Sequence, residues 1–281
     1  MKQIILIPID GTESIKEVLL YTNSITTPAD TRLVLIHVTS GMNTVNSRDE
    51  IHPNVNIIYS ALNEKGWDVE EEIKQGDPVE EIIKFAASLP TTLILMSTHG
   101  RSGIERIREG SVTEQVLKQS PCPVFILHSS VAEPADNRTE QLFRRIFVPL
   151  DGTDTSSAIL GCVKQFAHNH DAEVVLFHDD IEQQDSEQEN NAIKTRLENQ
   201  SVELANSGLK VSLDMSSYKR PIREILERVD TLGIDLVAMA THGKEGKKRA
   251  LDESVTAEVI RHVKCPLLVW AADPQCPAQK A

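Results

Sequence analysis

The sequence predicts two tandem α/β domains, each an open parallel five-stranded sheet with helices on both faces. Three observations support this fold class. Short apolar runs alternate with segments of helical periodicity, the same motifs occur twice, and a polar stretch separates the two occurrences. The offset between corresponding motifs stays close to about 140 residues, which indicates a duplicated domain because solenoid repeats are much shorter.

The first half contains five strand candidates separated by helical segments. Four runs are nearly continuously apolar, as expected for strands buried on both faces of a parallel sheet, and a fifth is more polar and reads as a sheet edge. The strand candidates are residues 3–9, 32–38, 67–74 (the polar run), 93–96 and 123–127. Helices are expected from residue 15, through about residue 63, from Pro78 and from Ser111.

The second half repeats this order. Residues 146–153 repeat the pattern of residues 5–12, and Thr241-His242-Gly243 corresponds to Thr98-His99-Gly100. The stretch between the halves is rich in Ala, Pro, Asp, Asn and Glu and predicts a linker. We therefore expect a domain over residues 1–129, a linker over 130–142 and a second domain over 143–281.

Composition narrows the function classes. The chain has 281 residues, 40% of them hydrophobic, and a formal net charge of −13, which argues against a general nucleic-acid binder. No apolar run reaches the length of a membrane span, and the N-terminus lacks a signal-peptide pattern, so we expect a cytoplasmic protein. The four cysteines form no C-x-x-C pair, which fits a reducing compartment and indicates no metal site. A P-loop motif and paired catalytic carboxylates are also missing from the sequence.

The chemistry-bearing stretch of the first half is residues 97–111. It follows an apolar strand and leads into a helix, so in a parallel sheet it lies at the carboxyl edge, where open α/β folds hold ligands. Gly100 and Gly110 allow the backbone to approach a bound group, and Ser111 begins a helix whose N-terminus favours an anion. The stretch predicts a phosphate site; a simple turn with a serine cap is the alternative.

Several polar residues admit two interpretations. Asp10 ends a strand and could hydrogen-bond a nucleoside or only cap a turn. His99 and His242 suggest a general base, but the sequence indicates no nucleophilic partner, so we favour packing roles and assign no catalytic residue. Asp77, before Pro78, is expected to cap a helix. His37 and His178 stay open, and Cys122 and Cys265 are expected to be inert core thiols rather than redox sensors.

The chain resembles the universal stress protein family in its tandem-domain form. The family's phosphate signature is glycine, two residues, glycine, nine residues, glycine, then Ser or Thr. In the first half Gly100, Gly110 and Ser111 match, while Ser97 replaces the leading glycine. The resemblance implies that Asp10 and Val38 line the adenine and ribose pocket. It implies a nucleotide-binding set of Asp10, Val38, Ser97, His99, Gly100, Arg101, Gly103, Gly110, Ser111 and Val112.

The second half departs from that signature. Ala240 replaces the leading glycine, Glu253 replaces the glycine before Ser254, and Asp179 stands where the first half has Val38. A carboxylate at the start of the helix would interact with the dipole itself and repel a polyphosphate. We therefore expect the second site not to bind ATP.

The resemblance implies a stress-response regulator that binds ATP, ADP or AMP, with or without Mg²⁺, at one site in the first domain. At most, weak ATPase activity is expected. The alternatives are a nucleotide-independent scaffold and a slow ATP hydrolase. Residues 124–127 and 267–270 are apolar end strands, and the resemblance implies that they pair to form an intrachain pseudo-dimer. Further homodimerisation and protein partners stay open.

Overall fold

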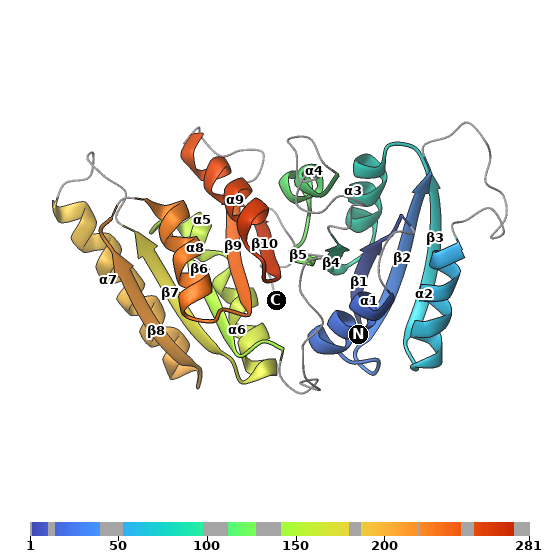
Figure 1. Cartoon of the computed structure of the whole chain (residues 1–281), viewed down its shortest axis with the longest axis horizontal. Helices are drawn as coiled ribbons and strands as arrows, with labels where there is room; N and C mark the ends of the chain where they lie inside the picture. The colour runs from blue at the N-terminus through green and yellow to red at the C-terminus, as the bar shows by residue number, and fades with distance from the viewer. Residues whose placement is uncertain are drawn as a thin grey trace. The chain divides into compact units, whose positions relative to one another are not determined.

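Each half of the chain folds into a parallel α/β sheet of five strands, as the alternation of apolar and helical segments predicts (Figure 1). The computed structural model describes residues 2–10, 15–39, 53–97, 112–127, 142–179, 187–218, 220–242 and 250–272. The described residues up to Leu127 belong to unit 1, and those from residue 142 onward to unit 2. The tandem α/β fold class is thereby confirmed.

Unit 1 has the strand order β3-β2-β1-β4-β5, and its neighbouring strands are parallel. The predicted elements are found within a few residues of their expected bounds. They are β1 (Gln3–Pro8), α1 (Ile15–Ile25), β2 (Thr31–Thr39), α2 (Pro53–Glu64), β3 (Asp68–Gln75), α3 (Pro78–Ser88), β4 (Thr91–Ser97), α4 (Val112–Gln119) and β5 (Val124–Leu127).

Unit 2 repeats this arrangement as β10-β9-β6-β7-β8, again with parallel neighbours. Its elements are β6 (Arg145–Pro149), α5 (Asp154–Ser157), α6 (Leu160–His170), β7 (Glu173–Asp179), α7 (Glu187–Asn206), β8 (Lys210–Ser216), α8 (Pro221–Thr231), β9 (Leu236–His242), α9 (Ala250–His262) and β10 (Leu267–Ala272). The segment after β6 forms two helices where the repeat predicts one. Helix α9 starts four residues before Ser254, the position that matches Ser111.

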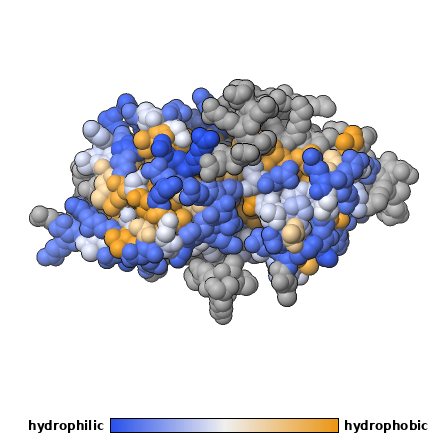
Figure 2. All heavy atoms as spheres, turned by 90° about the horizontal axis from the view of Figure 1, so that it is seen from below, coloured by the Kyte–Doolittle hydropathy of each residue, from blue (hydrophilic) through white to orange (hydrophobic). Residues whose placement is uncertain are grey.

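Aliphatic side chains fill both cores. The central strands are buried on both faces, with Leu6, Leu33 and Ile94 in unit 1 and Phe147 and Leu236 in unit 2 almost inaccessible to solvent. Strand β3 consists mainly of charged and polar residues, which suits its place at the end of the strand order. On the face shown in Figure 2, hydrophilic residues cover much of the described surface and hydrophobic ones form smaller patches.

The strand order reverses direction once in each unit. From β1 the chain moves outward to β2 and β3 and then returns to β4 on the other side, and β6 and β9 are related in the same way. Right-handed crossovers then place α1 with α2 on one face and α3 with α4 on the other, in agreement with the packing of those pairs. The carboxyl ends of β1 and β4, and of β6 and β9, flank the switch point, where ligands bind in this fold class.

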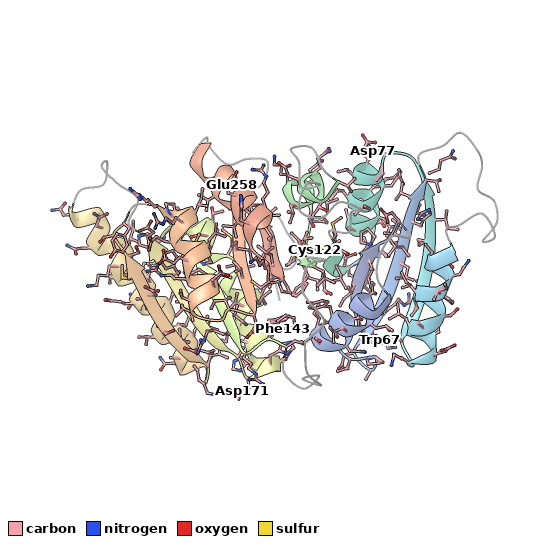
Figure 3. The ribbon with its side chains drawn as sticks, viewed as in Figure 1. Trp67, Asp77, Cys122, Phe143, Asp171 and Glu258 are labelled. Atoms are coloured by element: carbon pink, nitrogen blue, oxygen red, sulfur yellow. The ribbon has the colours of Figure 1, made fainter. Side chains whose placement is uncertain are left out.

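Helix α3 begins as the sequence predicts. Asp77 caps it: the Asp77 carboxylate accepts hydrogen bonds from the backbone N–H groups of Val79 (2.9 Å) and Glu80 (3.0 Å). Figure 3 shows Asp77 at the start of this helix. A search of the described helices finds none that is both long and apolar enough to cross a bilayer.

Candidate functional site

Four residues of the predicted nucleotide set lie around the switch point of unit 1. Asp10 follows β1, Val38 lies near the end of β2, Ser97 ends β4 and Val112 begins α4. Asp10 is exposed, while Val38 and Ser97 are half-buried. The parallel pairing of β1 with β2 and with β4 places Asp10, Val38 and Ser97 at the same edge of the sheet.

The remaining six residues of the set lie outside the described residues. They are His99, Gly100, Arg101, Gly103, Gly110 and Ser111. Their roles, like those of Arg106 and Arg108, stay predictions from the sequence.

A histidine holds the turn at the switch point in each unit. His37, near the end of β2, donates from Nδ1 to the backbone carbonyl of Ile9 at 2.8 Å. His178, which is buried near the end of β7, makes the same bond to the carbonyl of Leu150 at 2.7 Å. Because a carbonyl only accepts, Nδ1 carries the proton in both cases. These two histidines, left open by the sequence, therefore fix the backbone that leads into Asp10 and Asp151.

Asp151 of unit 2 has the turn role that the sequence offered as one alternative for Asp10. Its Oδ1 accepts hydrogen bonds from the Thr153 backbone N–H (2.9 Å) and the Thr153 hydroxyl (2.6 Å). Thr153 in turn caps α5 by accepting from the Ser156 N–H at 3.1 Å. Asp151 thus organises the start of the next helix through local bonds.

Asp179 places a buried carboxylate in the unit 2 site. It is 4% exposed, and its Oδ2 accepts a hydrogen bond from the backbone N–H of Arg220 at 2.7 Å. Arg220 precedes α8 at the position that Asp77 occupies before α3, and its side chain makes no capping bond. The sequence showed the change from Val38 to Asp179, but the bond to Arg220 was missed because it joins residues 41 apart.

The described residues of unit 2 leave only a small cavity at its switch point. Its volume is about 70 Å³. Ligand pockets in proteins usually measure about 300–1,000 Å³. Apolar side chains from β6, β7, α8, β9 and α9 line it together with four polar residues: Asp151, Ser156, Asp179 and Thr256.

Beneath this site lies an ion-pair network that sequence reasoning missed. Arg228 of α8 donates to Asp214 of β8 (2.6 and 3.3 Å) and to Glu224 one turn earlier (2.6 Å). Its guanidinium also lies over the Phe177 ring, 4.6 Å from the centroid. The two carboxylates outweigh the effect of burial and raise the pKa of Arg228. The i, i+4 spacing of Glu224 and Arg228 was the only signal in the sequence.

Helix α7 packs directly on the turn after β6. Gly152 has a φ of +83°, and a Cβ atom there would lie 2.6 Å from Cγ2 of Ile193. Arg196 donates to the Gly152 carbonyl at 2.8 Å and pairs with Asp154 at 3.0 Å. The glycine is therefore required both by its conformation and by the approach of α7.

The residues that the structure describes do not indicate a reactive cysteine or a metal site. Burial, reinforced by the charges of Asp235 and Asp230, raises the pKa of the Cys265 thiol to about 12. Cys122 is buried, and its thiol lies 3.9 Å from the Ser120 hydroxyl. Within the residues that the structure describes, no three His, Cys, Asp or Glu side chains gather as a metal site would need.

Comparison with known proteins identifies the family. The family model for the "Universal stress protein family" matches residues 1–128 and 142–270. Universal stress protein MJ0531 of Methanocaldococcus jannaschii is 42% identical over 64 residues, which cover 23% of this chain and 38% of that protein. Universal stress protein Slr1230 of Synechocystis is 28% identical over 121 residues, 43% of this chain and 41% of that protein. The matches thus span less than half of these relatives.

The solved structures agree on the fold. A universal stress protein from Archaeoglobus fulgidus superposes with a TM-score of 0.67 at 20% identity, covering 95% of this chain and 97% of that one. At this level of identity the likeness concerns the fold alone. The two matches of the family model together cover most of the chain, and the chain belongs to the universal stress protein family, with two tandem domains of that family.

Proposed function

We propose that this protein is a stress-response regulator that binds one adenine nucleotide per chain, in unit 1. The observation that carries the proposal is the contrast between Val38 and Asp179 at the same point of the duplicated sheet. Unit 1 presents a half-buried aliphatic side chain there, whereas unit 2 presents a buried carboxylate that lines a cavity of about 70 Å³. A buried carboxylate there is harder to cover with an uncharged adenine and ribose than the aliphatic Val38 is, and the cavity is smaller than a nucleotide needs.

The proposal for the phosphate-binding end of the site is supported by the sequence. Gly100, Gly110 and Ser111 supply the glycine-rich loop and the helix start in unit 1, and Glu253 replaces the second glycine in unit 2. Helix α9 begins at Ala250, so Asp252 and Glu253 belong to its first turn. Mg²⁺, if it accompanies ATP, would be held mainly by phosphates and water, since the described residues offer no acidic cluster for it.

Calorimetric titration of ATP, with and without Mg²⁺, tests this proposal. We expect about one nucleotide per wild-type chain, loss of binding in Gly110→Glu, and weaker binding in Val38→Asp. The matched control, Asp179→Val, changes the corresponding position of unit 2 and should leave the stoichiometry near one. Binding of two equivalent nucleotides per chain would refute the proposal of a single site. No binding to wild type in two independent assays would favour the nucleotide-independent scaffold.

The proposed activity is regulation by occupancy, with phosphate release from ATP near the uncatalysed background. Release well above background that is abolished by Gly110→Glu would instead identify an ATP hydrolase. We place this role in the cytoplasm, since Cys122, Cys162 and Cys265 are free thiols, as is usual in a reducing compartment.

We also propose that the two units form an intrachain pseudo-dimer through β5 and β10. Each is an apolar strand at the end of its unit's strand order, and apolar edges need cover. A compact pair of units predicts a radius of gyration of about 19 Å for this length of chain. Small-angle scattering of the monomeric chain, at about 0.5 M salt, that gave a clearly larger value would contradict it.

A further inference from the structure

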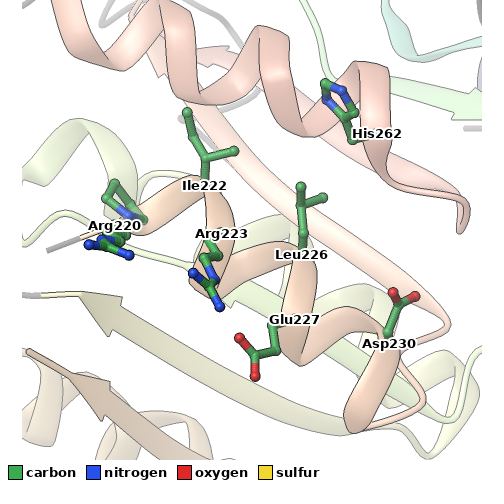
Figure 4. A pocket seen from close by; sticks show the side chains of 8 residues that line it. Arg220, Ile222, Arg223, Leu226, Glu227, Asp230 and His262 are labelled. Carbon is green, nitrogen blue, oxygen red and sulfur yellow. The ribbon is translucent and has the colours of Figure 1, made fainter. Parts of the chain in front are cut away.

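Unit 2 carries an open groove between α8 and α9, apart from the proposed nucleotide site of unit 1. Its volume is about 620 Å³ (Figure 4). Ile222 and Leu226, both half-buried, form its apolar part. Figure 4 shows these two side chains on the side of α8 that faces α9, with His262 across the groove.

Four exposed charged residues of the groove form a stripe along α8, which we call the α8 stripe. It consists of Arg220, Arg223, Glu227 and Asp230. The spacings of four and three residues keep Arg223, Glu227 and Asp230 on one side of the helix, and Arg220 is the residue directly before it. None of the four side chains forms an ion pair within the part of the chain that the structure describes, in contrast to Arg228 of the same helix.

The polarity of the stripe opposes the helix dipole. Arginines lie at the N-terminal end of α8 and carboxylates toward its C-terminal end, whereas a helix favours the reverse arrangement. The inward-facing pair on the same helix follows the rule, with Glu224 in the first turn and Arg228 in the last. Helix α3 of unit 1 follows it too, since Asp77 and Glu80 lie at its start. On α8 the preferred order of charges is therefore reversed only on the exposed face, which indicates that these four residues serve an interaction outside the helix.

The stripe is complementary to itself. Its four residues are symmetric in sequence about position 225, so an antiparallel second copy of α8 places Arg220 opposite Asp230 and Arg223 opposite Glu227. A two-fold axis makes each of these pairs twice, which is the pattern of an isologous interface. Ile222 and Leu226 border the stripe on the side that faces α9, and they offer the second copy an apolar surface within the groove.

From this symmetry we propose that the groove is the docking surface for a second copy of this chain, with α8 packed antiparallel on α8 across a two-fold axis. The charges are exposed, so each pair contributes modestly and is screened by salt. The dimer is therefore weak and dissociates as ionic strength rises. This interface is separate from the predicted nucleotide residues, so each proposal can fail without the other.

Sedimentation velocity of the full chain tests the proposal over a concentration series at about 0.05 M and about 0.5 M salt. Wild type should dimerise at low salt and dissociate at high salt. The acidic variant, Arg220→Glu with Arg223→Glu, and the basic variant, Glu227→Arg with Asp230→Arg, should each dimerise about tenfold more weakly or worse. The equimolar mixture of the two should form a heterodimer, and all four substitutions in one chain should restore self-association.

The control variant carries the matched reversal on α3 of unit 1, Glu80→Arg with Lys84→Glu, and should dimerise like wild type. Both reversals on α8 agree with the helix dipole, so loss of the dimer cannot be assigned to loss of the helix. Circular dichroism checks that each variant is folded. A monomeric wild type at low salt, dimerisation of the acidic or basic variant at wild-type strength, no heterodimer in the mixture, or loss of the dimer in the α3 control would each overturn the proposal.

Discussion

Replacing Arg228 by methionine should destabilise unit 2 by about 3 kcal/mol, because it leaves two carboxylates without their cation. Glu224 and Asp214 are 9% and 33% exposed, so the cost comes chiefly from Glu224, while water solvates part of the Asp214 charge. The contact of the guanidinium with the Phe177 ring is lost as well. For a unit of this size, the loss should lower the melting temperature by about 10 °C.

The assay is urea and thermal unfolding followed by tryptophan fluorescence. The chain has two tryptophans, Trp67 in unit 1 and Trp270 in unit 2, so a Trp67→Phe background reports on unit 2 alone. Arg223→Met on the exposed side of α8 is the control and should cost under about 0.5 kcal/mol at dilute protein. Adding Glu224→Gln to Arg228→Met should recover part of the loss. A cost below about 1 kcal/mol for Arg228→Met would refute the argument from desolvated charge.

Three further predictions concern other features of the two units. Gly152→Ala should destabilise unit 2 by about 3 kcal/mol, since the alanine would combine a positive φ with a clash against Ile193. Gly208→Ala, at a φ of +94° in open space, should cost only about 1 kcal/mol. Equal losses of stability in urea unfolding would contradict the role of the Ile193 contact. Cys162 and Cys265 are both half-buried, but the pKa of the Cys265 thiol is raised to about 12, so at pH 8 Cys265 should react with a thiol reagent far more slowly than Cys162. Mass spectrometry of the labelled sites checks this order, and faster labelling of Cys265 would contradict it. Burial against Phe143 and Phe166 lowers the pKa of His170. As pH drops below about 6.5 the unfolded chain is protonated at His170 before the folded chain, so the free energy of unfolding should fall. His170→Phe should flatten this pH dependence, and an unchanged profile would exclude His170 as its source.

Much of the fold could be predicted because its signals are local and occur twice. The apolar run that became β1 and the Asp77-Pro78 pair that begins α3 each identify an element by neighbouring residues alone. The repeat then supports most of these assignments a second time. The polar character of β3 likewise predicts an edge strand, which is its place at the end of unit 1's strand order.

The candidate site could be predicted only in part, because its contacts join distant residues. The sequence shows that Asp179 replaces Val38, but only the fold brings its carboxylate to the Arg220 N–H. The same holds for Arg228, whose partner Asp214 lies on another strand. Helix α9 begins earlier than the repeat predicts because a match of motifs fixes equivalent positions and leaves helix ends free to differ.

The bonds from His37 and His178 to the preceding turn have a consequence for the nucleotide binding proposed above. Each unit fixes the backbone that leads into its switch point with a bond from its own chain, so this turn is held without any bound group. If unit 1 binds a nucleotide as proposed, this part of its site is already ordered before binding, which lowers the entropic cost of binding. The same bond occurs in unit 2, so the turn keeps its geometry in both copies, whichever of them binds the proposed nucleotide.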